Sequence, residues 1–247
     1  MAEHNNPGCW VSSEVLRFLV GSDEQKKFVV HESVLANLSA GMKAFVETAK
    51  LEENTEIIQW AEIEPETADC LVEFAYTGDF KSPGFQRMAT GQVVENYRKL
   101  HTRPQFGSSK VLEWAWEEFV SKSWDYNEKQ MLYDISQDTS KPDALCTVAQ
   151  VYGFACDYGI EDLKALALNK LHRLMVCFQD EDDIIKFLWL CADYESSDEL
   201  FRTASQYATL TVGLFESKEP FKALMSEHPI FAESAFWWQQ SILHQYA

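Results

Sequence analysis

Basic side chains are scarce in this sequence, which holds 21 Lys and Arg against 39 Asp and Glu and has a formal net charge of −18 at pH 7. A surface this acidic repels phosphate groups, so general nucleic-acid binding is not expected, and solubility explains the acidity more simply. The basic cluster at residues 98–103 is expected to pair with carboxylates of the chain itself.

Long apolar runs are also missing. No stretch approaches the roughly 20 apolar residues of a membrane-spanning helix, and the most apolar one, 184–192, is short and interrupted by Lys186. The opening residues, MAEHNNPG, have neither the basic region nor the apolar core of a secretion signal. We therefore expect no membrane partner and an intracellular location, in the cytoplasm, the nucleus or both.

The spacings of common catalytic and metal sites are absent as well. The six cysteines form no C-x-x-C pair, and the histidines form no H-E-x-x-H motif. No nucleophile elbow, P-loop or dinucleotide fingerprint occurs. Acidic pairs such as Glu52-Glu53 are more typical of solvated helix faces than of cation sites. We therefore predict no catalytic residue, no metal site and no cofactor, and buried free thiols that suit a reducing compartment.

The sequence does contain a strand that leads directly into a helix, within residues 28–45. Phe28-Val29-Val30 is typical of a strand. After His31 the apolar period changes from two to about 3.6, at Val34, Leu35, Leu38 and Met42. His31 stands at this junction, where we expect it to bond to the backbone rather than act as a ligand or base.

Further elements are predicted on both sides of this stretch. Residues 14–20 and 26–30 are expected to form a β-hairpin, and 56–63 a third strand. One helix is expected over 32–40, with Gly41 loosening its end before 42–49, and another from 64 to a stop at Gly78. Later helices are expected at 144–158 with Asp143 as N-cap, at 163–176 after a left-handed Gly159, and at 182–194, 198–215, 220–225 and 230–244.

Residues 81–142 form the least regular part of the chain, since Pro and Gly interrupt them repeatedly. A helix is predicted inside them, at 111–120, and Trp114, Trp116 and Trp124 make this region aromatic. One interpretation is an exposed recognition patch, because large aromatic side chains anchor interfaces. The interpretation that we favour is that these rings pack against the body of the protein.

The order of these motifs resembles a BTB/POZ domain of a divergent, fungal type, followed by a helical extension of the BACK type. The resemblance rests on residues 15–21, 28–39, 57–68, FAYTGDF at 74–80, and 151–167. It implies an α+β fold, with a small β-sheet capped by α-helical hairpins and an all-α C-terminal extension. The implied organisation is a flexible tail at 1–12, a BTB/POZ-like domain at 13–176 with a long insertion at 81–142, and a BACK-like extension at 177–247.

Two features depart from the family pattern. Many animal members carry a strand and a helix before the first strand, and that segment builds a swapped homodimer. Here only a short polar tail precedes Glu14. The segment between Phe80 and Ala144 is also much longer than the family usually has, and loops of such length are usually functional or disordered.

A short motif gives the resemblance a candidate binding site. Family members that bind the cullin scaffold of a ubiquitin ligase carry a hydrophobic-x-Glu sequence just after the helix that follows the His. Leu51-Glu52-Glu53 occupies the corresponding position, a few residues past Phe45. The resemblance implies that Leu51 enters an apolar pocket and Glu53 pairs with a base at its rim, with Phe45 on the same surface. An ordinary surface loop is the alternative, since three residues match easily by chance.

The leading hypothesis is therefore a non-enzymatic protein–protein interaction module, an adaptor or scaffold, whose specific form is a substrate adaptor of a cullin-type ubiquitin ligase. The alternative is a self-associating structural or regulatory BTB protein that does not bind cullin. A homodimer of that kind needs a self-complementary apolar face, and the residues at helical spacing, Val34, Leu38 and Met42, are the candidates for it.

Overall fold

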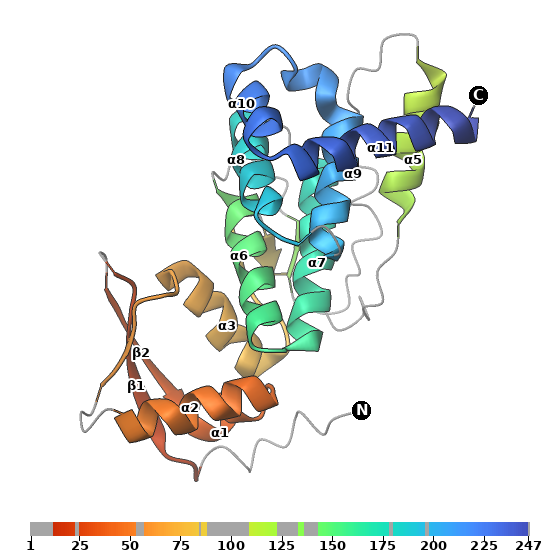
Figure 1. Cartoon of the computed structure of the whole chain (residues 1–247). Helices are drawn as coiled ribbons and strands as arrows, with labels where there is room; N and C mark the ends of the chain where they lie inside the picture. The colour runs from red at the N-terminus through yellow and green to blue at the C-terminus, as the bar shows by residue number, and fades with distance from the viewer. Residues whose placement is uncertain are drawn as a thin grey trace.

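The computed structural model describes residues 12–22, 25–52, 57–83, 85–87, 109–122, 133–135, 143–177, 180–195 and 198–246. Apart from Ser12, the predicted tail lies outside these residues. The first part contains β1 (Val15–Val20), β2 (Lys26–His31), α1 (Glu32–Ala36), α2 (Ala40–Glu52), β3 (Ile58–Trp60) and α3 (Pro65–Thr77). Figure 1 shows the sheet at one end of the molecule, with the later helices stacked away from it.

The three strands form one sheet in the order β2-β1-β3. β1 and β2 are antiparallel, with Val15 opposite His31, whereas β3 runs parallel to β1, with Phe18 opposite Ile58. The predicted strand at 56–63 is shorter in the structure, since only Ile58–Trp60 pairs. One face of the sheet is buried, and its residues belong to the core: Leu16, Phe18, Val20, Phe28, Val30, Ile58 and Trp60.

The strand-to-helix junction is confirmed, because β2 ends at His31 and α1 begins at Glu32. His31 bonds to the end of α3: Tyr76 Oη lies 2.7 Å from its Nδ1 and accepts a 3.0 Å hydrogen bond from its backbone N–H. The partner that these contacts show for His31 is therefore a side chain of α3. The bond ties the first hairpin to α3.

Gly41 has a different role from the one predicted. It lies in the first turn of α2, not at a loosened helix end. A Cβ atom at this position would lie 2.5 Å from the carbonyl oxygen of Tyr158. That carbonyl accepts a 2.6 Å hydrogen bond from Ser39 Oγ. Glycine therefore allows α2 to approach the end of the later helix α6 (Ala144–Asp157) closely.

Replacing Gly41 by Ala is expected to lower the free energy of unfolding by about 1–3 kcal/mol, because the backbone of Tyr158 must move to admit the methyl group. Urea unfolding measures this change. Gly213→Ala is the matched control, since Gly213 is also helical but a Cβ there meets nothing within 4 Å. That variant is expected to gain about 0.5–1 kcal/mol. Equal changes in the free energy of unfolding for the two variants would contradict the close approach of Gly41 to Tyr158.

The region predicted to be an insertion contributes regular structure. It contains α5 (Lys110–Ser121), which the sequence predicted, and a two-stranded antiparallel sheet of β4 (Phe85–Arg87) and β5 (Tyr133–Ile135), which it did not. Phe85 and Tyr133 are buried in the core. Ser109 begins α5, since its side chain accepts a hydrogen bond from the N–H of Leu112.

The helical hairpin of α6 and α7 (Glu161–Cys177) forms the centre of the molecule. Gly159 ends the first helix in the left-handed region, at φ 63°, as predicted. Asp143 precedes α6, but its side chain does not cap the helix as predicted. Its backbone has φ 61°, and its carboxylate lies 3.4 Å from Lys186 Nζ instead.

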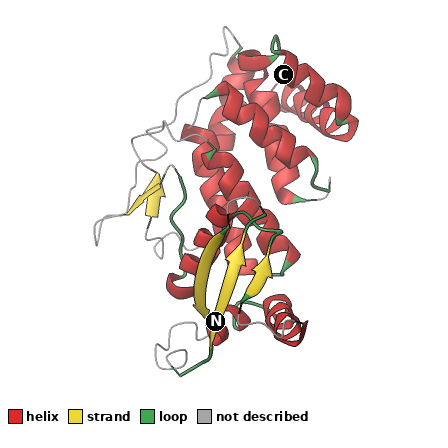
Figure 2. Cartoon of the chain, turned by 90° about the vertical axis from the view of Figure 1, so that its left-hand side faces the viewer, coloured by secondary structure: helices red, strands yellow, loops and turns green. Residues whose placement is uncertain are grey.

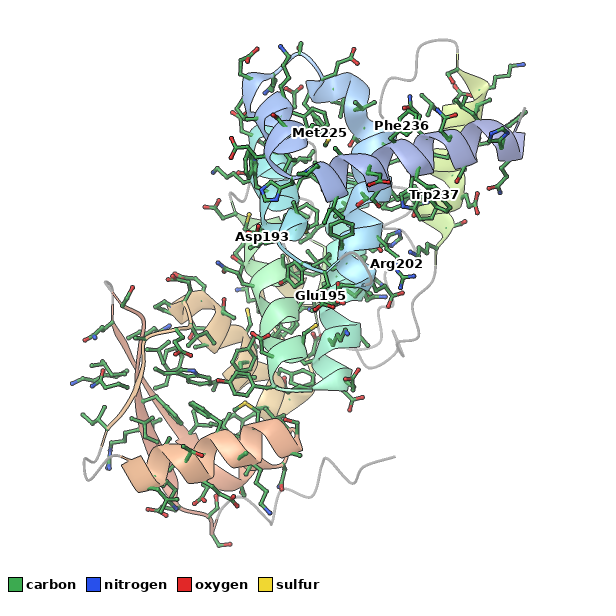
Figure 3. All side chains as sticks on the ribbon, viewed as in Figure 1. Asp193, Glu195, Arg202, Met225, Phe236 and Trp237 are labelled. Carbon is green, nitrogen blue, oxygen red and sulfur yellow. The ribbon has the colours of Figure 1, made fainter. Side chains whose placement is uncertain are left out.

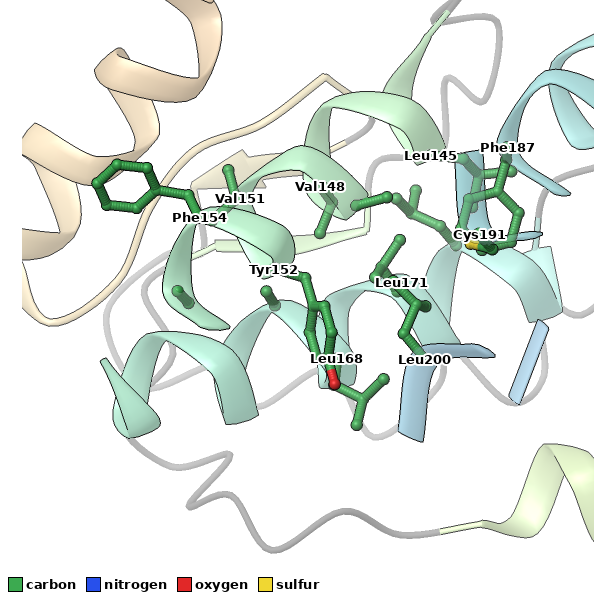
Figure 4. Close-up of a cluster of buried hydrophobic side chains, with 14 of the residues drawn as sticks. Leu145, Val148, Val151, Tyr152, Phe154, Leu168, Leu171, Phe187, Cys191 and Leu200 are labelled. Carbon is green, nitrogen blue, oxygen red and sulfur yellow. The ribbon is translucent and has the colours of Figure 1, made fainter. Parts of the chain in front are cut away.

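Four helices follow: α8 (Glu181–Ala192), α9 (Glu199–Phe215), α10 (Glu219–Glu227) and α11 (Pro229–Tyr246). Asp180 and Asp198 cap the first two by accepting hydrogen bonds from backbone N–H groups. Side chains from α6, α7, α8 and α9 meet in one buried cluster (Figure 4). The fold is thus α+β, with a small sheet followed by an all-α part. None of the helices described combines the length and apolar character needed to cross a bilayer.

Candidate protein-binding surfaces

The last turn of α2 presents one strongly exposed apolar side chain. Leu51 is 86% exposed, more than any other large apolar side chain in the described ranges. The preceding residue holds this turn in place: Lys50 Nζ lies 2.7 Å from Glu14 Oε2 and 3.0 Å from Glu32 Oε2. The hydrogen bond from Lys50 lowers the pKa of Glu14, and the bonds to both carboxylates raise the pKa of Lys50. Leu51 therefore projects from a helix end that is tied by ion pairs to Glu14 and Glu32.

The other two residues of the predicted site, Glu53 and Phe45, are not shown as exposed side chains like Leu51. Glu53 lies outside the described residues. Phe45 is half-buried, and its ring lies 4.8 Å from that of Trp60 and 5.6 Å from that of Tyr158. It packs the first helices against the sheet and α6, and its contact with a partner stays a prediction.

The three tryptophans of the predicted recognition patch do not form one surface. Trp116 is buried, at 1% exposure, and its ring stacks on Phe119 at 5.8 Å. Trp114 is 51% exposed on the outer side of α5. Trp124 lies outside the described residues. The interpretation that these rings pack against the body of the protein is therefore correct for Trp116. This side chain cannot belong to an exposed patch.

The face suggested for self-association is also part of the core. Val34 is 7% exposed and Met42 is fully buried, while Leu38 is partly buried against them. A dimer built on this face would require the protein to open its own interior. A homodimer through these three residues is therefore not compatible with the structure.

A second exposed apolar surface occurs on α11, where four side chains are between 47% and 63% exposed: Ile230, Phe236, Trp237 and Leu243. Figure 3 shows Phe236 and Trp237 along this helix. The sequence revealed the aromatic residues but not their exposure, because apolar residues occur on several sides of this helix and no stripe marks its buried side. We call these four residues the α11 surface.

A buried charged cluster joins the end of α3 to α7. Lys170 and Asp79 are both fully buried, and Lys170 Nζ lies 2.8 Å from Asp79 Oδ1. Lys170 also donates to the carbonyl of Phe80 at 2.6 Å. Burial lowers the pKa of Lys170, and the charge of Asp79 opposes that shift. The pair has no opening to a ligand, so its role is structural.

The same cluster holds the small sheet of β4 and β5. The second carboxylate oxygen of Asp79 accepts a 3.0 Å hydrogen bond from the N–H of Tyr133, and Tyr133 Oη donates to Glu73 on α3. The ammonium of Lys170 lies 4.5 Å from the ring centre of Phe85 and 5.6 Å from that of Tyr133. Two segments far apart in the sequence thus meet on α7.

No three His, Cys, Asp or Glu side chains come together as a metal site would need, within the part of the chain that the structure describes. Cys70 and Cys191 are buried, and burial raises the pKa of the Cys70 thiol to about 12. These two thiols therefore belong to the buried interior.

The comparison with protein families matches residues 16–104 to the BTB/POZ domain. The chain carries a BTB/POZ domain. BTB/POZ domains are protein–protein interaction modules that also mediate dimerisation, and they are generally not enzymes. No curated protein matches the chain.

The BTB/POZ match contains the three-stranded sheet, α1 to α3, β4 and Leu51. It ends within the region that the sequence predicted to be an insertion. The helices α5 to α11, including the α11 surface, follow the match. The exposed Leu51 therefore belongs to the interaction module itself.

Proposed function

We propose that this BTB/POZ protein is a non-enzymatic substrate adaptor of a cullin-type ubiquitin ligase, acting inside the cell. The observation that carries the proposal is Leu51, an exposed apolar side chain held at the end of α2 by the ion pairs of Lys50. An exposed leucine beside carboxylates fits the arrangement of an apolar anchor with a charged rim. The sequence supplies that rim at Glu52 and Glu53.

An adaptor needs a second surface for the protein that it recruits. The α11 surface supports this part of the proposal, because Phe236 and Trp237 are 61% and 60% exposed. Aromatic side chains bury about 150–250 Å² each when fully covered. α2 and α11 lie at opposite ends of the molecule (Figure 1), so one partner at each end would not obstruct the other. The BACK-like identity of the C-terminal helices is part of this proposal.

Replacing Leu51 by Asp is expected to weaken binding to a cullin N-terminal domain by about tenfold or more, since the anchor would place a charge in an apolar pocket. Glu53→Lys is expected to act in the same direction by reversing the rim charge. Isothermal titration with a panel of purified cullin N-terminal domains measures both effects.

Ile230→Asp is the matched control for this experiment. Ile230 is 63% exposed on α11, so its replacement makes the same chemical change at the other end of the molecule and should leave cullin binding unchanged. The proposal fails if no cullin binds the unmodified protein, or if Leu51→Asp binds as tightly as the unmodified protein does.

A further inference from the structure

The outer face of the three-stranded sheet is open to solvent. Along β1 the buried residues alternate with Val15, Arg17 and Leu19, and on β2 Lys27 and Val29 point the same way. Val29 is 62% exposed and Val15 40%. In Figure 2 the strands face the viewer, and the helices of the domain lie behind and beside them.

Aliphatic and basic residues alternate on this face. Arg17 lies opposite Val29, and Leu19 lies opposite Lys27. Each pair therefore consists of one cation and one aliphatic side chain. In the first pair the cation lies on β1, and in the second pair it lies on β2. On adjacent strands, diagonal neighbours such as Arg17 and Lys27 have Cα atoms about 7–8 Å apart.

These two cations differ from the other basic residues around the sheet. Lys26 lies 2.6 Å from Asp69, and Lys50 is paired with Glu14 and Glu32. Neither Arg17 nor Lys27 forms an ion pair in the described part of the chain. Two neighbouring cations that have no carboxylate partner among the described residues repel one another, and they do so on a chain whose formal net charge is −18. An incoming carboxylate would relieve this repulsion.

We propose that the outer face of the three-stranded sheet binds an extended acidic segment of a partner protein, whose sheet-facing residues alternate between carboxylate and aliphatic side chains. Its carboxylates pair with Arg17 and Lys27, and its aliphatic side chains cover Val29 and Val15. An extended segment turns every second residue toward the surface on which it lies, so the carboxylate and aliphatic residues that meet this face are two positions apart in the segment. This site is separate from Leu51 and does not rest on cullin binding.

Other occupants fit this face less well. A nucleic acid or an anionic membrane would have to approach a chain of net charge −18 and would leave the exposed valines without apolar contacts. A second copy that met this face with its own outer face would add two more cations, Arg17 and Lys27, and no carboxylate. A short acidic segment brings carboxylates to these cations and contacts only this face.

The probe for this proposal is a yeast-displayed library of random 12-residue peptides, selected on the full-length protein. The peptides that bind are then measured against Arg17→Glu/Lys27→Glu. Lys110→Glu/Arg202→Glu is the matched control, because these two residues are also exposed and form no ion pair with any described residue, and the double variant changes the net charge equally. Val29→Thr removes aliphatic surface but keeps a β-branched residue. Melting curves confirm that each variant is folded.

Selected peptides are expected to be rich in Asp or Glu, with Val, Ile or Leu two positions away from the acidic residues, so that both kinds lie on the same side of the extended peptide. Their affinity should fall about tenfold or more with Arg17→Glu/Lys27→Glu, fall less with Val29→Thr, and stay unchanged with the control and with Leu51→Asp. The proposal is overturned if the selection yields no acidic peptides, or if Arg17→Glu/Lys27→Glu binds them as the control does. The proposal is also overturned if light scattering finds a dimer that Arg17→Glu/Lys27→Glu dissociates, because this face would then be the interface between two copies of the chain.

Discussion

Asp79→Ala is expected to lower the free energy of unfolding by about 3–5 kcal/mol, the usual cost of leaving a buried charge without its partner. Lys170 would keep its ammonium group, fully buried, with the Phe80 carbonyl as its remaining oxygen partner among the contacts described above. The N–H groups of Phe80 and Tyr133 would also lose their acceptor. Urea unfolding followed by circular dichroism measures the loss.

Two companion variants make this prediction specific. Asp69→Ala removes the ion pair with Lys26, in which both side chains are 50% exposed, so it should cost no more than about 1 kcal/mol. Asp79→Ala/Lys170→Met removes both charges and should recover part of the stability, because no unpaired ion remains inside. If Asp79→Ala costs no more than Asp69→Ala, the buried pair does not hold the fold together.

Trp116→Ala is expected to destabilise the protein by about 3–5 kcal/mol, as the loss of a large buried aromatic side chain usually does. Its ring is almost inaccessible and contacts Phe119 and Tyr207, with ring centres 5.8 and 6.3 Å away. The cavity left behind would lie between α5 and α9. Thermal and urea unfolding both report on this change.

Trp114→Ala is the internal comparison, since the two tryptophans are neighbours on the same helix. Trp114 is 51% exposed, so its removal is expected to cost about 1 kcal/mol or less. Similar losses for the two variants would mean that α5 does not pack on α9 through Trp116.

Much of the domain could be predicted from the sequence because its signals are local. The change of period after His31, the proline and acidic residues that open α3, and the glycines after α3 and α6 each act within a few residues. The resemblance to a BTB/POZ domain depended on the order of these signals, and the family comparison agrees with it.

The features that could not be predicted depend on contacts between distant residues. α7 contains polar residues, which usually face solvent, yet Asn169, Lys170, His172 and Arg173 are all buried. His172, for example, lies 2.8 Å from the Phe119 carbonyl of α5. The periodicity within α7 does not reveal that α5, which lies dozens of residues earlier in the sequence, covers it. The exposure of Leu51 and the packing of Phe45 against Trp60 and Tyr158 are tertiary features of the same kind.

The Asp79–Lys170 pair also sets a condition on how the protein is synthesised. Lys170 follows Phe80 by 90 residues, and ribosomes add about 5–20 residues per second, so the carboxylate waits roughly 5–18 s for its ammonium partner. During that interval the counter-ion that binds the end of α3 has not yet been synthesised. The native contacts there close only after α7 has left the exit tunnel, which makes this junction a late step of folding during translation.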